Sequence, residues 1–390
     1  ALSGKLNFPR RVYTSYYNSA VYNTFKVFSD SIMEALKREN IKAPLYILKA
    51  DGGAVSLEMG KERPVETILS GPAASIMGTM LSFPTKKDAV FMDIGGTTTD
   101  ISFIADGVPL FEPLGIKIGK YPTLVRALYN VSIGVGGDSS VSVSDNKITI
   151  GPKRQGPPMA LGGPSPTPTD AMIVLGLVEI GDAQKALLSI SKLGEQLGLT
   201  AEDMAKKILT TMSHMIKQRV YELLKEVNSH PVYTVKELLH GRKIEPEAVY
   251  IIGGPAKAMC PFLEHEFKIP CQYPKNYKVS NAIGAAFSKI TAEITMFVDT
   301  VRKTLTVPEL GIHENIHKTY DIKKYRHDAV DLLRKKAYAL GASHEEIEPE
   351  IIEESSFNMV RDFYSRGKNI RIKVQTKPGL VDGLGGVKNV

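Results

Sequence analysis

Residues 93–100 read Asp93-Ile94-Gly95-Gly96-Thr97-Thr98-Thr99-Asp100 and lie between two short apolar runs, 89–92 and 101–104. Apolar runs on both sides of a Gly-rich turn predict a strand, a turn and a second strand. Adjacent glycines let backbone N–H groups approach an anion, and threonine hydroxyls add further donors. The carboxylates of Asp93 and Asp100 bracket the turn and suit a hydrated Mg²⁺. The stretch therefore predicts a phosphate-binding hairpin, with an ordinary Gly-Gly hairpin as the alternative.

A second glycine pair follows another apolar run. Residues 249–252 read Val-Tyr-Ile-Ile, and Gly253 and Gly254 come directly after them, before a possible helix start. In α/β folds, ligands collect at the carboxyl ends of strands, and glycines there leave room for a flat base or a ribose. We expect the two Gly-Gly junctions to form half-sites that face each other across a cleft, with Gly253 and Gly254 receiving an adenosine.

Several stretches, taken in order, resemble the hydantoinase/oxoprolinase family, and the resemblance covers about residues 8–300. The stretches that carry it are Ala50-Asp51-Gly52-Gly53, Ser70-Gly71-Pro72-Ala73-Ala74, the 93–100 run, Ile133-Gly134-Val135-Gly136-Gly137-Asp138-Ser139, and Pro168-Thr169-Asp170-Ala171. The resemblance implies an α/β fold with an actin-like ATPase (ribonuclease H-like) core, the core shared by actin, sugar kinases and heat-shock chaperones. A small α+β appendage at the C-terminus completes the expected fold.

The resemblance also implies ATP and Mg²⁺ as cofactors. Asp93 and Asp100 are then the expected catalytic residues and the expected metal ligands. In such sites a carboxylate orients the attacking group or holds Mg²⁺, and most of the rate comes from positioning and neutralisation of charge. The residues expected to bind the nucleotide are Gly95, Gly96, Thr97, Thr98, Gly136, Gly137, Gly253, Gly254 and Asn281.

The chain departs from the family pattern in three places. Gly136-Gly137-Asp138 stands where the family usually has three glycines, and residues 156–161 differ from its usual Pro-Gly-Pro-Ala-Cys-Tyr stretch. Both departures lie in loops expected near the substrate, so the family's substrate does not carry over. The family's first phosphate loop, Asp-Val-Gly-Gly-Thr, has no counterpart before residue 93. We expect this chain to be the C-terminal part of a longer or split protein that binds ATP poorly alone.

These observations suggest three domains. Residues 1–88 are expected to hold the rest of the first lobe and a linking helix. Residues 89–305 are expected to form the second ATPase lobe with a helical insertion. Residues 310–390 are expected to form the small α+β domain, for which packing or subunit contact is the expected role.

Composition indicates a globular chain. Of its 390 residues, 43% are hydrophobic and 23% are charged, and no apolar run is long enough to span a membrane. The two cysteines, Cys260 and Cys271, make neither a disulfide framework nor a zinc set, which favours the cytoplasm. The net charge of +7 is mostly scattered, and without a basic–aromatic patch it does not favour nucleic-acid binding.

Local patterns predict the main elements. Apolar periodicity predicts helices over 20–38, 201–227 and 325–340, and the small residues after Asn281 suggest a helix to about 303. Residues 152–168 are rich in proline and glycine, which excludes a regular helix or central strand. We expect an ordered loop there that ends in a helix capped by Thr169 or Asp170. Strands are expected at 350–353, 357–364 and 370–376.

The best functional hypothesis from the sequence is an ATP-dependent hydrolase subunit that acts on a cyclic amide of the hydantoin or oxoproline type. Phosphoryl transfer would activate an amide or carboxyl oxygen for attack by water. One alternative is a subunit of an ATP-dependent ketone carboxylase. Another is a non-metabolic ATPase of the cofactor-reactivating chaperone type. The expected partners are a small cyclic amide or related carbonyl substrate, the missing N-terminal segment, and a second large hydantoinase-type subunit.

Overall fold

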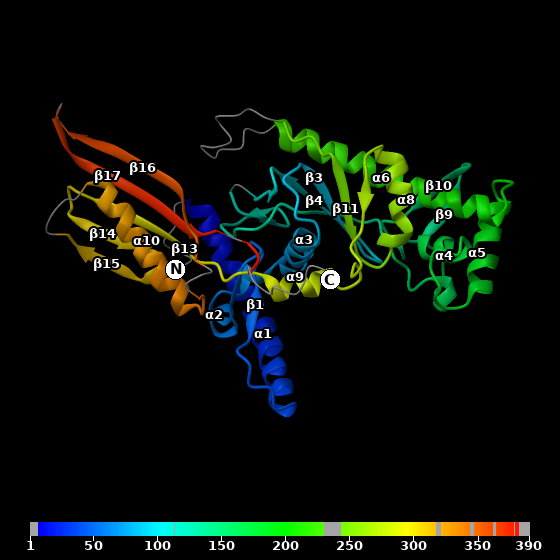
Figure 1. Cartoon of the computed structure of the whole chain (residues 1–390), viewed down its shortest axis with the longest axis horizontal. Helices are drawn as coiled ribbons and strands as arrows, with labels where there is room; N and C mark the ends of the chain where they lie inside the picture. The colour runs from blue at the N-terminus through cyan, green and yellow to red at the C-terminus, as the bar shows by residue number, and fades with distance from the viewer. Residues whose placement is uncertain are drawn as a thin grey trace. The chain divides into compact units, whose positions relative to one another are not determined.

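The computed structural model describes residues 7–112, 114–229, 243–316, 321–343, 347–361, 364–377 and 379–381. The chain divides into two compact units. Their helices and strands are labelled in Figure 1. The first contains residues 1–73, 111–128 and 285–385, and the second contains residues 74–110, 129–284 and 386–390. Within the described part of the chain, no helix is both long and apolar enough to cross a membrane.

The second unit is built on a mixed sheet with strand order β12–β11–β3–β4–β5, and β8 also pairs with β4. β11 runs parallel to β3 and β12, whereas β4 is antiparallel to β3, β5 and β8. The strands are β3 (Ala89–Ile94), β4 (Thr99–Ala105), β5 (Val108–Pro109), β8 (Val131–Ile133), β11 (Ala248–Ile252) and β12 (Cys271–Gln272). The predicted strand–turn–strand at residues 89–104 is confirmed.

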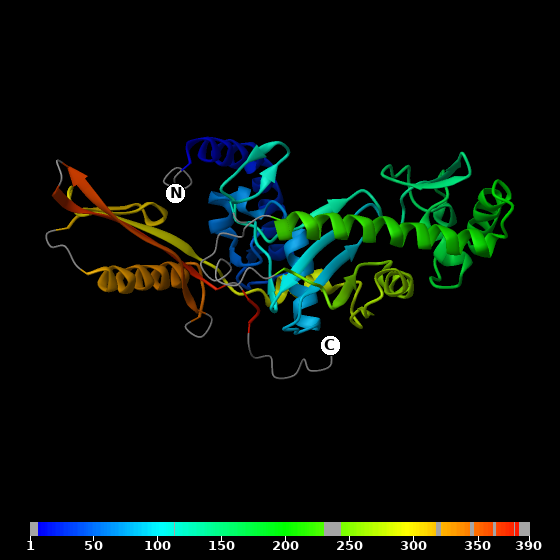
Figure 2. The same cartoon turned by 90° about the horizontal axis from the view of Figure 1, so that it is seen from above.

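Alternation along the strands explains how helices cover this sheet. Val90 and Met92 of β3 and Ile251 of β11 join one buried cluster with side chains of α6 and α8. Phe91 and Tyr250 point the other way, where Tyr250 stacks on Phe83 beyond the end of α3. Figure 2 shows α6 running along the sheet. The helices are α3 (Ser70–Ser82), α6 (Ala201–Ser229), α8 (Ala256–Phe267) and α9 (Ser280–Phe287).

Residues 141–195 form an additional lobe of the second unit. It comprises the hairpin β9 (Val141–Ser144) and β10 (Lys147–Ile150), the 3-10 turn η2 (Met159–Leu161), and helices α4 (Pro168–Val174) and α5 (Ala183–Glu195). The Pro-rich segment is an irregular loop apart from η2, as predicted. The cap of α4 is Thr167, not Thr169 or Asp170, because Asp170 at the third helical position completes a capping box with it.

The first unit contains a five-stranded antiparallel sheet with strand order β15–β14–β13–β17–β16, covered by α10. Its elements are β13 (Glu293–Asp299), β14 (Thr304–Val307), η3 (Pro308–Leu310), β15 (Ile312–Asn315), α10 (Ile322–Ala339), β16 (Pro349–Arg361) and β17 (Tyr364–Thr376). The apolar face of α10 packs on alternate residues of β13 and β17. The helix predicted near 325–340 is confirmed. The three expected strands are two longer ones, because 350–353 and most of 357–364 belong to the single strand β16, and 370–376 is the second half of β17.

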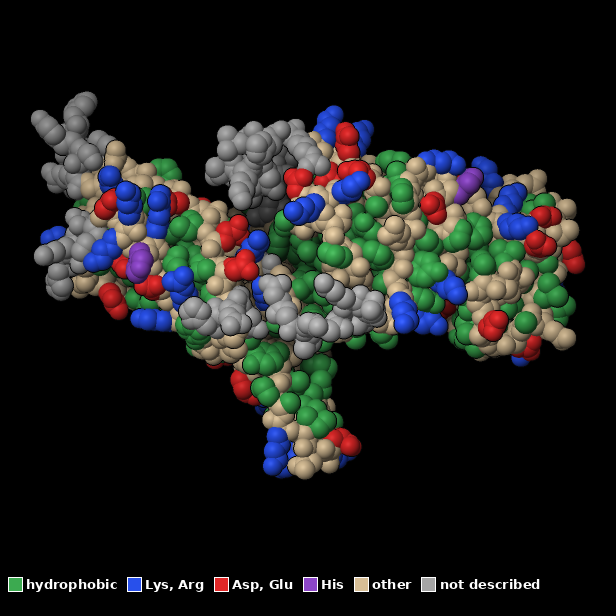
Figure 3. Space-filling model, viewed as in Figure 1, with side chains coloured by type: hydrophobic (Ala, Val, Ile, Leu, Met, Phe, Trp, Pro, Cys, Tyr) green, Lys and Arg blue, Asp and Glu red, His purple; other side chains and the backbone are tan. Residues whose placement is uncertain are grey.

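The rest of the first unit precedes and flanks this sheet. It contains α1 (Phe8–Arg38), β1 (Tyr46–Leu48), β2 (Ala54–Ser56), α2 (Leu57–Glu62), η1 (Pro64–Thr67), β6 (Lys117–Ile118) and β7 (Tyr121–Pro122). Arg10 of α1 donates to the carbonyls of Leu114 and Thr123 at 2.6 and 2.8 Å, which ties the helix to the β6–β7 hairpin. Apolar side chains line the exposed length of α1 (Figure 3).

Three expectations about elements differ from the structure. The helix expected from residue 20 begins at Phe8, because Asn7 caps it and Pro9 fits its first turn. The helix expected over 281–303 ends at Phe287, and residues 293–299 form β13, paired with β17. That pairing places residues 285–305 in the first unit, whereas the sequence assigned them to the second lobe.

Candidate functional site

The 93–100 run forms the tight end of the β3–β4 hairpin. Asp93 pairs with Asp100 and Ile94 with Thr99, and the N–H of Gly95 donates to the carbonyl of Thr98 at 2.9 Å. The turn therefore consists of residues 95–98, with the two carboxylates opposite each other at its base. Thr97 is exposed, while Gly95, Gly96 and Thr98 are half-buried.

The loop at 136–138 packs directly on this turn. The N–H of Gly137 donates to the carbonyl of Gly95 at 2.9 Å, and the N–H of Asp138 donates to the carbonyl of Gly96 at 2.6 Å. A Cβ at Gly136 would lie 2.6 Å from the Gly96 carbonyl oxygen, so only glycine permits this approach. Gly136 and Gly137 are thus in direct contact with Gly95 and Gly96.

The second glycine pair lies beside the turn on the neighbouring strand. Because β11 is parallel to β3, with Ile252 paired to Asp93, both strands end at the same edge of the sheet. Gly253 has φ of 95°, and a Cβ there would lie 2.3 Å from the Ile94 carbonyl oxygen. The expectation of two half-sites facing across a cleft is therefore wrong, because the junctions end adjacent strands. A Cβ at Gly254 would meet nothing within 4 Å, which leaves open space there.

The two carboxylates have different environments. Ser75 of α3 donates to Asp93 Oδ2 at 2.6 Å, and Asn130 donates to Asp100 Oδ1 at 3.3 Å. Burial is the main cause that raises the pKa of Asp93 above its usual value, and the negative charge of Asp100 raises it further, against the Ser75 hydrogen bond. A positive charge between the carboxylates would offset both effects.

The carboxylate pair fits Mg²⁺ better than a metal bound entirely by protein. Among the described residues there is no group of three or more His, Cys, Asp or Glu side chains that could hold an ion. Mg²⁺ commonly takes one or two carboxylates and fills its other positions with water and phosphate oxygens. Asp93 and Asp100 match that requirement in kind and number.

Asn281 was also predicted to bind the nucleotide, but no contact given for the described residues joins its side chain to the 95–98 turn. Asn281 lies exposed in the first turn of α9, where its side chain accepts a hydrogen bond from the N–H of Ala282 at 2.8 Å. Helix α9 packs closely on α3, since a Cβ at Gly284 would lie 2.1 Å from the Ala74 carbonyl oxygen. Its role in nucleotide binding stays a prediction.

Sequence reasoning missed three side chains around the turn. Ser75 contacts Asp93, and Arg154 contacts both Thr97 and Asp138. Ser75 belongs to α3, whose first turns contain the 70–74 stretch that carries the family resemblance, and it lies one residue beyond that stretch. The departure from three glycines at Asp138 was the available signal for the Asp138–Arg154 pair.

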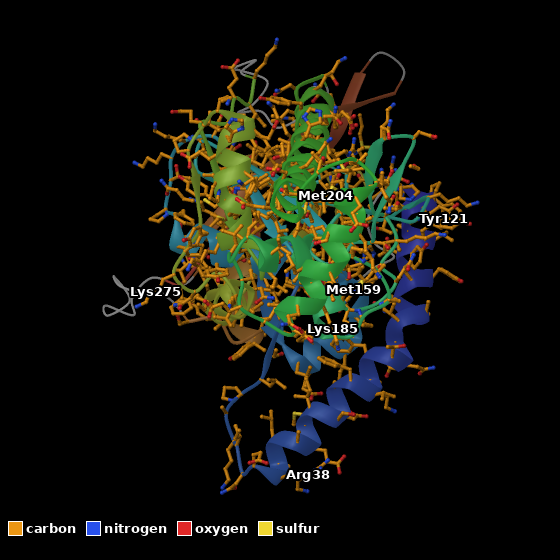
Figure 4. All side chains as sticks on the ribbon, turned by 90° about the vertical axis from the view of Figure 1, so that its right-hand side faces the viewer. Arg38, Tyr121, Met159, Lys185, Met204 and Lys275 are labelled. Atoms are coloured by element: carbon orange, nitrogen blue, oxygen red, sulfur yellow. The ribbon has the colours of Figure 1, made fainter. Side chains whose placement is uncertain are left out.

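A cavity of about 310 Å³ lies elsewhere in the second unit, between η2 and α5. Figure 4 labels two of its lining residues, Met159 and Lys185, which lie near each other in that view. None of the site residues predicted from the sequence lines it. The cavity is therefore separate from the glycine-rich edge of the sheet.

Two solved structures share the fold over nearly the whole chain. A nucleotide-free acetone carboxylase superposes with a TM-score of 0.65 at 14% identity, covering 97% of this chain and 58% of that one. An ATP-dependent caprolactamase from Pseudomonas jessenii gives 0.61 at 18% identity, covering 96% and 60%. The predicted fold class, an α/β fold of the actin-like ATPase type, is confirmed.

Sequence comparisons give the family. An uncharacterized protein of Methanocaldococcus jannaschii is 29% identical over 242 residues, which is 53% of this chain and 34% of the relative. The acetophenone carboxylase gamma subunit of Aromatoleum aromaticum is 29% identical over 155 residues, 37% of this chain and 21% of that subunit. The matches thus span about a third and about a fifth of these two relatives. A sequence profile described as hydantoinase/oxoprolinase matches residues 11–294, and the chain belongs to that family.

Proposed function

We propose that this chain carries a phosphate-binding hairpin of an ATP-dependent enzyme subunit that hydrolyses a cyclic amide of the hydantoin or oxoproline type. The observation that supports it is the meeting of three glycine-rich segments at one sheet edge, with two facing carboxylates at the base of the turn. Family membership and the likeness to an ATP-dependent caprolactamase support the reaction class.

The residues at this end of the sheet have different proposed roles in binding Mg-ATP. ATP, when bound, supplies a phosphoryl group that turns an amide or carboxyl oxygen into a better leaving group. The 95–98 turn and the 136–137 loop offer backbone and hydroxyl donors to phosphate oxygens. Asp93 and Asp100 would hold Mg²⁺, which would supply positive charge to neutralise the phosphates beside the turn. Gly254 leaves the open space that a ribose or a base needs.

An ATP-dependent ketone carboxylase subunit is the second candidate. It is favoured by the similarity to the acetophenone carboxylase gamma subunit and by the shared fold with acetone carboxylase. Product analysis separates the two, since a hydrolase opens an amide whereas a carboxylase consumes bicarbonate and a ketone. A chaperone-type ATPase would need a protein partner and would release no small-molecule product.

The proposed enzyme needs further polypeptide besides this chain. This chain corresponds to 58% of the acetone carboxylase chain and 60% of the caprolactamase chain. We propose that a segment carrying the family's first phosphate loop, and a second large hydantoinase-type subunit, complete the enzyme in the cytoplasm. The chain alone should then bind ATP weakly and hydrolyse it negligibly, because donors on one side only hold the phosphates.

Replacement of Gly254 tests the nucleotide site. Gly254→Val fills open space beside the turn without a clash, so the free energy of unfolding should change by less than about 0.5 kcal/mol. The Kd for Mg-ATP, measured by calorimetry in a complex that binds it, should rise by about tenfold or more. Gly379→Val is the matched control, since a Cβ there also meets nothing closer than 3.9 Å. Unchanged affinity in Gly254→Val would show that the nucleotide binds elsewhere.

A further inference from the structure

An arginine from the Pro-rich loop lies on the 95–98 turn. Arg154 Nη1 donates to Thr97 Oγ1 at 3.2 Å, and Nη2 donates to Asp138 Oδ2 at 2.8 Å. Its Nε donates to the carbonyl of Gly156 at 3.2 Å. These three bonds use one N–H of each guanidinium nitrogen. Two of the five N–H groups are therefore not used in these bonds to the described residues and can donate to a ligand. The side chain is 42% exposed, so a ligand can reach it.

Asp138 holds that arginine in place. Its side chain is only 17% exposed, and Thr169 Oγ1 donates to its Oδ1 at 3.1 Å. Its Oδ2 lies 2.6 Å from the position that a Cβ at Gly96 would occupy, so the carboxylate rests directly against the turn. A carboxylate alone at this place would repel a phosphate. Paired with Arg154, it fixes the guanidinium beside the turn, because a half-buried carboxylate with two hydrogen-bond partners has little freedom to move.

The hydroxyl of Thr97 is oriented by the same pair. Thr97 Oγ1 accepts a hydrogen bond from Arg154 Nη1, which leaves the hydroxyl proton free to turn toward another acceptor. Thr97 is exposed. Arg154 and Thr97 thus offer adjacent donors on the solvent side of the turn, in an arrangement that suits the oxygens of one phosphate group.

We infer that Arg154 binds a phosphate group held at the 95–98 turn and that Asp138 is its positioning residue. The inference rests on the proposed function, because it assumes a phosphorylated ligand at this turn. It deepens that proposal by assigning a cation to the phosphate site, in the place where the chain departs from the three-glycine pattern. Asp138 and Arg154 together replace a glycine that could contribute only its backbone.

A different role for Arg154 would be to neutralise Asp138 and nothing more. The two roles are separated by combining Arg154→Gln with Asp138→Gly. If Arg154 only neutralises the carboxylate, removal of Asp138 restores the affinity lost in Arg154→Gln. If Arg154 contacts phosphate, Arg154→Gln weakens binding in both backgrounds.

The experiment measures weak binding to the 390-residue chain by ligand-detected NMR, with Mg-ATP, inorganic tripolyphosphate and adenosine as probes. Arg154→Gln should raise the Kd for Mg-ATP and tripolyphosphate by about tenfold, both alone and with Asp138→Gly, and leave adenosine unchanged. The control is Arg219→Gln. Arg219 lies on α6 and forms ion pairs with Glu222 and Glu226 of the same helix. Thermal unfolding verifies that each variant is folded.

Three results would overturn the inference. Unchanged phosphate affinity in Arg154→Gln, or recovery of affinity on adding Asp138→Gly, would remove Arg154 from the phosphate site while leaving the proposed function intact. An equal loss of adenosine and tripolyphosphate binding would show that Arg154 supports the fold of the edge only. Absence of Mg-ATP binding both by the wild-type chain at millimolar concentrations and by its complex with the segment that carries the first phosphate loop would overturn the proposed function and this inference together.

Discussion

Two antiparallel hairpins of this protein carry an aspartate and a glycine pair at their turns, one in each unit. In the first unit, β1 and β2 flank Asp51-Gly52-Gly53, and in the second unit β3 and β4 flank the 93–100 run. The two turns resemble each other in sequence, yet their aspartates have opposite electrostatic environments.

The charge of Asp51 is balanced inside the fold. Lys49 Nζ donates to its Oδ2 at 3.1 Å, and the N–H of Gly53 donates to its Oδ1 at 3.0 Å. Burial acts to raise the pKa of Asp51, but the positive charges of Lys49 and Arg126 outweigh it, so the pKa lies below its usual value. The turn is also closed, since a Cβ at Gly53 would lie 1.8 Å from Thr291 Oγ1.

The charge of Asp93 is not balanced in this way. Its pKa is raised by burial and by Asp100, and within the described part of the chain the only opposing influence identified is the Ser75 hydroxyl. Open space follows the neighbouring strand at Gly254. A Gly-rich turn with an aspartate is thus structural where the fold supplies the cation. It is a candidate ligand site where the fold does not.

The largest expected effect comes from Asp51. Asp51→Ala leaves Lys49 buried without its carboxylate, so the free energy of unfolding should fall by about 3–5 kcal/mol. Because the folded pKa is lowered, this stabilisation is present above the unfolded value of 3.8 and is lost as the pH falls through the folded value. Urea unfolding at pH 7 and pH 3 measures both effects. A loss below about 1 kcal/mol would show that the Lys49–Asp51 pair does not stabilise the β1–β2 turn.

Lys336 is a buried charge of the first unit that is poorly balanced. Burial, followed by the charge of Arg63, lowers its pKa to about 8, although its Nζ donates to the Glu293 carbonyl at 2.8 Å. Lys336→Met should raise the free energy of unfolding by about 2 kcal/mol at pH 7.

The sign of the pH dependence follows from the same shift. The unfolded chain keeps the Lys336 proton up to about pH 10.5, whereas the folded chain releases it near pH 8. The wild-type protein therefore gains stability from this group between those values, and the advantage of Lys336→Met should shrink there. An advantage that is constant with pH would show that packing, not charge, causes it.

Asp93→Asn should behave in the opposite way to Asp51→Ala. Asparagine keeps an acceptor for Ser75 and removes a charge that burial disfavours, so the free energy of unfolding should stay equal or rise at pH 7. The Kd for Mg-ATP should rise by about tenfold or more, because one carboxylate ligand is lost. Asp145→Asn, on the exposed turn between β9 and β10, is the control. A destabilised variant with normal Mg-ATP affinity would make Asp93 structural, like Asp51.

The elements that depend on neighbouring residues were predicted from the sequence. The predictions that failed concern contacts between residues far apart in the chain. The β3–β4 hairpin is encoded in adjacent residues, so its turn and its flanking strands were predicted. The helix expected over 281–303 failed because β13 is fixed by pairing with β17, and Glu293 meets Gln375 far along the chain. Arg154 was missed because nothing in a Pro-rich loop indicates which distant turn it reaches.

The glycine amides test most directly whether the β3–β4 turn, and not the β1–β2 turn, binds phosphate. The chain would be labelled with ¹⁵N-glycine and titrated with Mg-ATP, with each resonance assigned by substitution. We expect the amide resonances of Gly95, Gly96 and Gly254 to shift and those of Gly52 and Gly53 to stay in place. Binding that leaves the first group unshifted, or that shifts Gly52 and Gly53 instead, would contradict it.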